Sequence, residues 1–230
     1  MNHGDRYEEL LDRWEVFVRT QNPAETFVRD GIINETLWRT APQRIMFLLK
    51  ENNCAPNSVS ANAPLAQQRD FRLLCNERPW AEIGQWAYGL LYPSSNPEFA
   101  EANEHRDRAC RQIAIVNLKK TPGDNTSSND EIKKYALRDK ELLQEQIVLL
   151  HPDIVVCCGK DFVFPMAQEL FEDAQSAEEI ASRPLPGCRN PIRVFQGSCR
   201  AWVDFIHPSM RRGSRQEKYE NLMELCRSTM

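Results

Sequence analysis

The sequence predicts an α/β fold: a central, mainly parallel four-stranded sheet with helices on both faces and an N-terminal helical extension. Four apolar runs of strand length recur along the chain, and amphipathic helical segments separate them. Continuous apolar strands that alternate with helices are typical of a parallel sheet covered on both faces. The chain has 230 residues, 41% of them hydrophobic and 27% charged, which is enough for one core. We therefore expect a single domain with N-terminal helices over 1–43, a core over 44–213 and a C-terminal helix over 214–230.

The expected elements follow in chain order. Amphipathic spacing predicts a helix over residues 7–20, and Pro23 and Gly31 bracket a second, short helix. A capping box that pairs Ser128 with Glu131 starts the clearest helix, which runs to about residue 150. The expected strands are RIMFLL (44–49), IAIVN (113–117), DIVVCC (153–158) and AWVDFIH (201–207), with IRVF (192–195) as a candidate edge strand.

Composition excludes several classes of protein. No apolar run approaches the roughly 20 residues that a membrane span needs, and the first residues lack an apolar signal-peptide centre, so we expect a cytoplasmic protein with no membrane partner. The eight cysteines are scattered without metal-ligand spacing, so we expect reduced thiols and no metal site. Cys157 and Cys158 fall in an apolar run and are expected in the core. The net charge of −4 leaves room only for a local basic face.

The candidate site follows from the predicted sheet. In parallel α/β sheets, ligands bind beyond the carboxyl ends of the strands, so the polar residues directly after each apolar run are the candidates. They are Lys50, Glu51, Asn52 and Asn53 after the first run; Asn117, Lys119 and Lys120 after the second; Gly159 and Lys160 after the third; and His207, Pro208, Ser209, Met210, Arg211 and Arg212 after the last.

The ordered motifs KENN, VNLKKTPG, LLQEQIVLLHPDIVVCCG and HPSMRRG, which mark the strand ends, resemble those of the uracil-DNA glycosylase superfamily over residues 44–213. The resemblance implies a uracil-DNA glycosylase-like fold and three roles. Asn52 positions the attacking water, Asn117 recognises the base, and His207 stabilises the departing base. Branches with an iron–sulfur cluster carry a cysteine after the lysine of the second motif, where this chain has Lys120 and Thr121. We therefore expect neither a cluster nor another cofactor.

The chemistry of these residue types fits the implied reaction. Hydrolysis of an N-glycosidic bond needs a water on the sugar face and a donor near the base oxygen that takes up negative charge. Asn52 can orient that water and His207 can donate, while Glu51 either supports the water or pairs with a nearby cation. The amide of Asn117 fits uracil in one orientation and cytosine in the other, so the sequence leaves the base open.

Departures from the family pattern concern the pocket. Asn53 and Cys54 stand where many relatives have Pro and, in the most uracil-selective branch, a Tyr that blocks bulk at pyrimidine C5. We therefore expect a pocket less closed at C5, with Cys54 near the base. The segment of about 25 residues after Asn53 is long for a connection and is the expected pocket wall. Phe71 and Trp80 are candidates to stack on the extruded base, although each is also a plausible core residue.

DNA contact follows from the need to flip the nucleotide out of the stack. Met210 and Arg211 occupy the place of the family's wedge loop, and Arg215 and Lys218 extend a basic cluster behind them. The expected DNA-binding residues are Lys119, Lys120, Ser209, Met210, Arg211 and Arg212.

The sequence thus predicts a monomeric, monofunctional DNA glycosylase that extrudes a modified or mispaired pyrimidine and leaves an abasic site. The task is either DNA repair or, as in some cluster-free superfamily members that the chain resembles, defence against phage with glucosylated hydroxymethylcytosine. The alternative is a non-catalytic nucleic-acid or nucleotide binder on the same fold, because Asn activates water less strongly than Asp.

Overall fold

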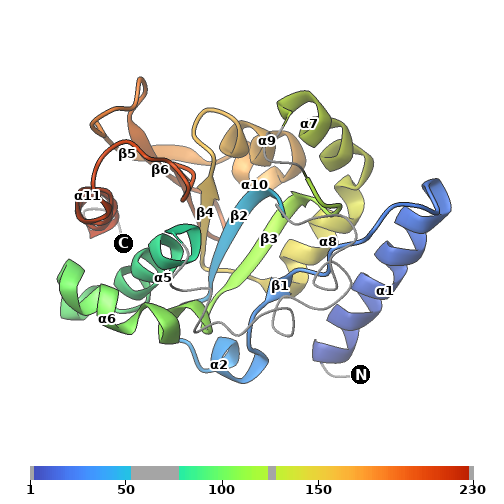
Figure 1. Ribbon diagram of the computed structural model, residues 1–230, viewed down its shortest axis with the longest axis horizontal. Helices are drawn as coiled ribbons and strands as arrows, with labels where there is room; N and C mark the ends of the chain where they lie inside the picture. Colours follow the sequence, from blue (N-terminus) through green and yellow to red (C-terminus); the bar gives the residue numbers. More distant parts are fainter. Residues whose placement is uncertain (1–2, 53–77, 124–127, 228–230) are drawn as a thin grey trace.

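The computed structural model describes residues 3–52, 78–123 and 128–227, and it has an α/β architecture (Figure 1). Within these ranges the strands form one seven-stranded sheet in the order β1-β3-β2-β4-β7-β6-β5. The strands are β1 (Gly31–Ile32), β2 (Ile45–Glu51), β3 (Ala114–Lys119), β4 (Ile154–Cys158), β5 (Glu178–Arg183), β6 (Ile192–Gln196) and β7 (Ala201–Phe205). The α/β class is confirmed, but the sheet is larger than the four strands expected and is mixed.

Parallel pairing joins β3 to β2, β2 to β4 and β4 to β7. Leu48 of β2, for example, pairs with Val116 on one side and Cys157 on the other. The remaining pairs, β1 with β3, β6 with β7 and β5 with β6, are antiparallel. The carboxyl ends of β3, β2, β4 and β7 consequently meet along one edge, which is where the sequence places the candidate site.

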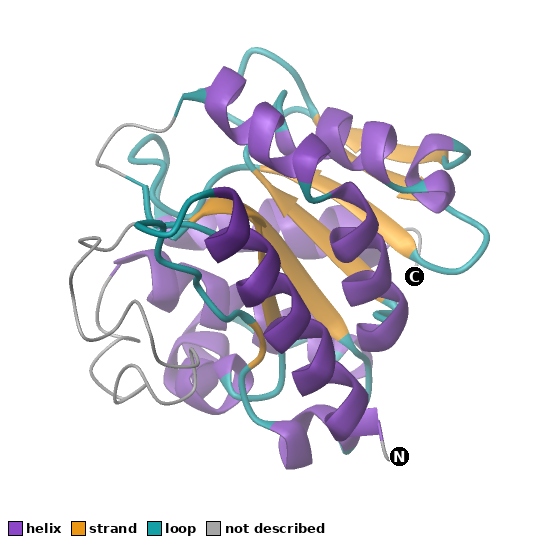
Figure 2. Ribbon diagram, turned by 90° about the vertical axis from the view of Figure 1, so that its right-hand side faces the viewer, coloured by secondary structure: helices purple, strands orange, loops and turns teal. Residues whose placement is uncertain are grey.

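Helices cover both faces of the sheet (Figure 2). Along β2, Phe47 faces a core with Trp86 and Tyr219, whereas Leu48 faces a core with Trp14 and Phe164, as the two-residue period of a strand requires. The first core is covered by α5 (Arg78–Leu91), α6 (Phe99–Cys110) and α11 (Arg215–Arg227), and the second by α1 (His3–Gln21), α7 (Asn129–Arg138), α8 (Lys140–Leu150) and α9 (Val163–Leu170). The shorter helices are α2 (Glu35–Arg39), the 3₁₀ turn η2 (Pro93–Ser95) and α10 (Glu172–Gln175).

Three expected elements differ in the structure. The prediction of a short helix between Pro23 and Gly31 is wrong: residues 23 and 24 form a turn, residues 25–30 have no regular secondary structure, and the backbone N–H of Val28 donates to the carbonyl of Lys120 at 2.7 Å. The helix expected over 128–150 is two helices, which meet at the buried Asp139. The capping prediction is confirmed, because the Ser128 hydroxyl accepts the N–H of Glu131 at 3.4 Å. Finally, β6 is not an edge strand, since β5 and β7 pair on its two sides.

Two predictions about composition can be compared with the structure. Cys157 and Cys158 are fully buried free thiols, and burial raises the pKa of both. Their core placement is confirmed. Among the helices of the described ranges, none combines the length and the apolar character that crossing a bilayer would require.

Candidate active site

The carboxyl edge of the parallel strands brings together residues that are far apart in the sequence. Glu51 ends β2 and pairs in register with Lys119, which ends β3. Asn52 follows directly, and its carbonyl accepts the N–H of Gly123 at 3.0 Å, which ties the end of β2 to the turn after β3. Since β4 pairs with β2 and β7 pairs with β4, all in parallel, the residues after β4 and β7, including His207, lie along the same edge.

His207 lies two residues beyond the end of β7, and its side chain is solvent-exposed. Its Nδ1 accepts the backbone N–H of Ser209 at 3.1 Å, and its carbonyl accepts the N–H of Met210 at 2.9 Å. Although part of the side chain reaches solvent, protein surrounds most of the ring, and this desolvation, helped by the charge of Lys50, lowers the pKa of His207 to about 4. The imidazole is therefore neutral at pH 7, and because Nδ1 is an acceptor, Nε2 carries the proton. The edge thus presents a neutral N–H donor.

Lys50 supplies a positive charge near His207. Its Nζ donates to Oδ1 of Asn129 at 2.8 Å and lies 5.0 Å from the centroid of the Phe162 ring. Burial lowers the pKa of Lys50, and the charge of Glu51 opposes that shift. The sequence places Lys50 at a strand end but gives it no role. Its effect on His207 depends on β2 and β7 ending on the two sides of β4, which only the strand order reveals.

Glu51 and Lys119 form a buried ion pair with an Oε2–Nζ distance of 2.9 Å, and each side chain is only 5% exposed. Glu131 of α7 adds a second carboxylate 2.7 Å from the same Nζ. Burial lowers the pKa of Lys119, but the two carboxylates raise it more, so the ammonium keeps its proton. The prediction that Lys119 contacts DNA is therefore wrong, because its charge is already neutralised inside the protein. Of the two roles open to Glu51, pairing with a cation is confirmed.

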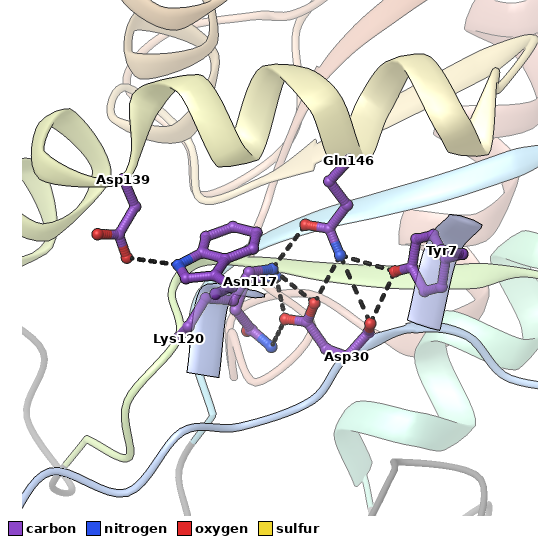
Figure 3. Close-up of polar contacts among 7 residues, drawn as sticks. Tyr7, Asp30, Asn117, Lys120, Asp139 and Gln146 are labelled. Atoms are coloured by element: carbon purple, nitrogen blue, oxygen red, sulfur yellow. Dashed lines mark hydrogen bonds and ion pairs between the residues drawn. The ribbon is translucent and has the colours of Figure 1, made fainter. Parts of the chain in front are cut away.

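A second buried network surrounds Asp30, in the segment before β1 (Figure 3). Its Oδ2 accepts both the backbone N–H of Asn117 at 2.7 Å and the side-chain Nδ2 of Asn117 at 3.0 Å. Its Oδ1 accepts Nζ of Lys120 at 2.5 Å, and the same Nζ donates to Oε1 of Gln146 at 2.8 Å. The Tyr7 hydroxyl donates to the carbonyl of Asp30 at 2.8 Å. Helices α1 and α8 are thereby joined to β3 through polar contacts.

Lys120 and Asn117, two of the predicted site residues, are both part of this buried network. Lys120 is fully buried, so the prediction that it contacts DNA is wrong; burial lowers its pKa, and the charge of Asp30 opposes that shift. Asn117 lies inside β3, opposite Leu49, rather than beyond the end of the strand. At about 3.3 Å per residue, it lies roughly 10 Å along the strands from Asn52. Its Nδ2 is committed to Asp30, and only its Oδ1 has no partner among the described residues. Base recognition by Asn117 stays a prediction.

The loop after β7 is held in place by a buried ion pair. Lys218 of α11 and Glu82 of α5 lie 3.1 Å apart from Nζ to Oε2, with exposures of 1% and 0%. The same Nζ donates to the carbonyl of Met210. Lys218 therefore does not belong to the basic surface cluster, because its ammonium is buried, pairs with Glu82 and holds the loop at Met210. Met210 packs partly buried against the core, whereas Ser209, Arg211 and Arg212 are exposed, as DNA-binding residues must be.

The other expected site residues are accounted for as follows. Trp80 lies in the first turn of α5 and packs against the core, where its carbonyl accepts Sγ of Cys110 at 3.6 Å. Cys54 and Phe71 lie outside the described residues. Lys160 is paired with the buried Asp204 at 2.5 Å. Asp204 also binds Arg193 at 2.9 Å and is fully buried, so it is a core acid whose charge two cations neutralise.

Two cavities lined by described residues lie away from this edge. One of about 220 Å³ lies between α5 and α11 near Gly89, Met223 and the start of β4 at Ile154. Ile154 begins a parallel strand, so this cavity is at the opposite, amino-terminal end of the sheet. Among the described residues, no group of three or more His, Cys, Asp or Glu side chains is placed to hold a metal ion.

Comparison with known proteins adds no family to this description. No protein-family model matches the chain, and no curated protein matches it with significance. Functional conclusions therefore rest on the geometry of the carboxyl edge.

Proposed function

We propose that the protein is a monofunctional DNA glycosylase, which hydrolyses the N-glycosidic bond of a flipped-out uracil or modified pyrimidine and leaves an abasic site. The biological task would be DNA repair or defence against phage with modified cytosines. The observation that supports this best is His207: an exposed, neutral imidazole whose Nδ1 is held by the Ser209 N–H and which lies close enough to Lys50 to be affected by its charge.

The donor side of the reaction follows from that arrangement. When the glycosidic bond breaks, the departing pyrimidine takes up negative charge, part of it on the carbonyl oxygen next to the nitrogen that leaves the sugar. Nε2–H of His207 can donate to this oxygen without transferring its proton, because the ring is neutral at pH 7 and a neutral imidazole is a very weak acid. A fixed donor and a nearby ammonium stabilise charge that develops only in the transition state, which is how such groups accelerate a reaction.

The water side depends on Asn52. Its backbone is fixed by Gly123, and it follows a strand whose last residue, Glu51, is held by Lys119. We assign the orientation of the attacking water to the Asn52 side chain and a positioning role to Glu51. A carboxylate neutralised by Lys119 is a poor general base, so the mechanism relies on an oxocarbenium-like sugar that a neutral water can attack.

The same ion pair also favours the competing function, a non-catalytic nucleic-acid binder. With Glu51 neutralised and Nδ2 of Asn117 committed to Asp30, two polar groups of the expected site are engaged within the protein. The two functions differ in one measurable product, the abasic site.

The test is a cleavage assay with labelled duplexes and single strands that carry uracil, hydroxymethylcytosine, its glucosylated form or hypoxanthine. Alkali-labile sites are expected with at least one base, and His207→Ala should lower the rate by about 100-fold or more, as loss of one such donor typically does. His151→Asn is the matched control: His151 lies before β4 at the opposite sheet edge with φ +45°, which Asn tolerates. Binding without any abasic product would support the non-catalytic function.

A further inference from the structure

Two loops beside the candidate site carry arginines and no acids. Residues 184–191 (PLPGCRNP) join β5 to β6, and residues 207–215 (HPSMRRGSR) lead from β7 into α11. Together they contain Arg189, Arg211, Arg212 and Arg215 without one Asp or Glu, although the whole chain has a net charge of −4. Such a local excess of positive charge in an acidic protein indicates an anionic partner at this surface.

The two loops are in direct contact. Nη1 of Arg212 donates to the carbonyl of Gly187 at 3.2 Å. A Cβ added to Gly187 would lie 3.2 Å from Cβ of Arg212, and Gly187 has a φ of +79°, which disfavours other residues. Glycine therefore allows the β5–β6 loop to turn closely against the loop that begins at His207.

Both loops are also anchored to the body of the protein. Leu185 is 5% exposed and packs in the core under α5 and α11. Nδ2 of Asn190 donates to Oδ1 of Asp161, after β4, at 2.9 Å. The second loop is held by the hydrogen bond from Lys218 to the carbonyl of Met210. Loops fixed in this way lose little entropy on binding, which favours them as a recognition surface.

The arginines of these loops differ from those beside them. Arg189, Arg211, Arg212 and Arg215 are exposed, and no ion pair joins them to a carboxylate within the described ranges. By contrast, Arg183 at the base of the same hairpin pairs with Glu224, and Arg193 pairs with the buried Asp204. Guanidinium groups with no carboxylate partner match the paired oxygens of phosphate, and Arg212 uses only one of its five N–H donors on Gly187.

We propose that residues 184–191 and 207–215 form one phosphate-binding surface for a nucleic-acid backbone, in which Arg189 of the β5–β6 loop is a contact that the strand-end motifs do not include. The proposal rests on the proposed function, because the second loop begins at His207 and the bound strand would be the one that presents its base there. The arginine-bearing loop surface extends the contact from the parallel strands to the antiparallel part of the sheet.

The test measures binding of a fluorescein-labelled oligonucleotide duplex by fluorescence anisotropy over a series of salt concentrations. Each phosphate contact that is lost should reduce the slope of log affinity against log salt by about 0.9 for a duplex. We expect Arg189→Ala and Arg211→Ala each to reduce the slope by about that amount, and Arg189→Lys to retain most of it. Arg183→Ala, a change of the same type in the same hairpin, is the matched control and should leave the slope unchanged.

Several outcomes decide the matter. If Arg189→Ala binds like Arg183→Ala, the surface as proposed is wrong. Binding to vesicles that contain phosphatidylserine, with none to DNA, would also overturn it in favour of a membrane surface. A parallel abasic-site assay separates this proposal from the proposed function. If the wild type makes no abasic sites but Arg189→Ala weakens DNA binding, the glycosylase function is wrong and the phosphate-binding surface stands. If the wild type makes abasic sites and Arg189→Ala leaves DNA binding unchanged, the surface is wrong and the glycosylase function stands.

Discussion

Replacing Lys120 by Met is the sharpest test of the buried network around Asp30. Both side chains are fully buried, the Nζ–Oδ1 distance is 2.5 Å, and the ammonium also lies 4.8 Å from the centroid of the Trp14 ring. Methionine has nearly the same shape but leaves the carboxylate without its counter-ion. Removing one partner of a buried ion pair costs about 3–5 kcal/mol, because the remaining charge cannot be solvated. A loss of that size is a large part of the 5–15 kcal/mol typical of a domain.

The measurement is urea unfolding followed by circular dichroism. Lys120→Met should lower the free energy of unfolding by about 3–5 kcal/mol, whereas Lys120→Met/Asp30→Asn should lose less, because no charge is left unpaired. Lys133→Met is the control: its partner Glu169 lies at 2.8 Å, but the two side chains are 48% and 42% exposed. Exposed pairs contribute about 0–1 kcal/mol, so this variant should be nearly neutral.

The opposite result would refute the reasoning. If Lys120→Met unfolded with a loss below about 1 kcal/mol and instead weakened DNA binding, the lysine would be a surface phosphate contact. The double variant then would not recover stability either, since Asp30 would not depend on Lys120.

Three further predictions concern the loops and His207. The Hε1 resonance of His207 should titrate near pH 4, well below the usual 6.5, and Lys50→Met should raise this pKa. Because the unfolded chain binds that proton near pH 6.5, His207 should make stability fall as pH drops from 6.5 towards 4; titration near 6.5 in the folded state would contradict both statements. Lys218→Met should destabilise the protein by about 3–5 kcal/mol and speed amide hydrogen exchange around residue 210. The double variant Lys218→Met/Glu82→Gln should lose less stability, and equal losses in the two variants would argue against the ion pair. Gly187→Ala should cost more than about 1 kcal/mol in urea unfolding because of its positive φ, and a gain in stability would refute that conformation.

The sequence predicts the parallel strands well because each is buried on both faces and reads as an unbroken apolar run. It misses β5 because that strand is not buried in this way. Five of the six residues in Glu178–Arg183 are exposed, so this strand has no apolar run to reveal it. The irregular segment after Pro23 is also missed, since Val28 is fixed by a backbone hydrogen bond to Lys120, a partner that no local pattern indicates.

The candidate site is predicted less well, because charge pairing depends on partners distant in the chain. Lys119 and Lys120 read as surface cations at a strand end. Their counter-ions, Glu51 and Asp30, are 68 and 90 residues away, and only the strand order brings them close. His207 is the opposite case: its Nδ1 bond is to the N–H two residues on, so the local motif already contains the contact that fixes its tautomer.

The two ends of the sheet bear on how the protein behaves at high concentration. An outermost strand offers unpaired backbone groups to which a second copy can add, and this is a common route to aggregation. Here β1 is only two residues long, and β5 carries the charges of Glu178, Glu179 and Arg183 together with a register shift between Glu179 and Ala181. For a strand of a neighbouring molecule, β1 is too short to pair with, and β5 is irregular and charged. Extension of the sheet from one molecule to the next is therefore disfavoured at both edges.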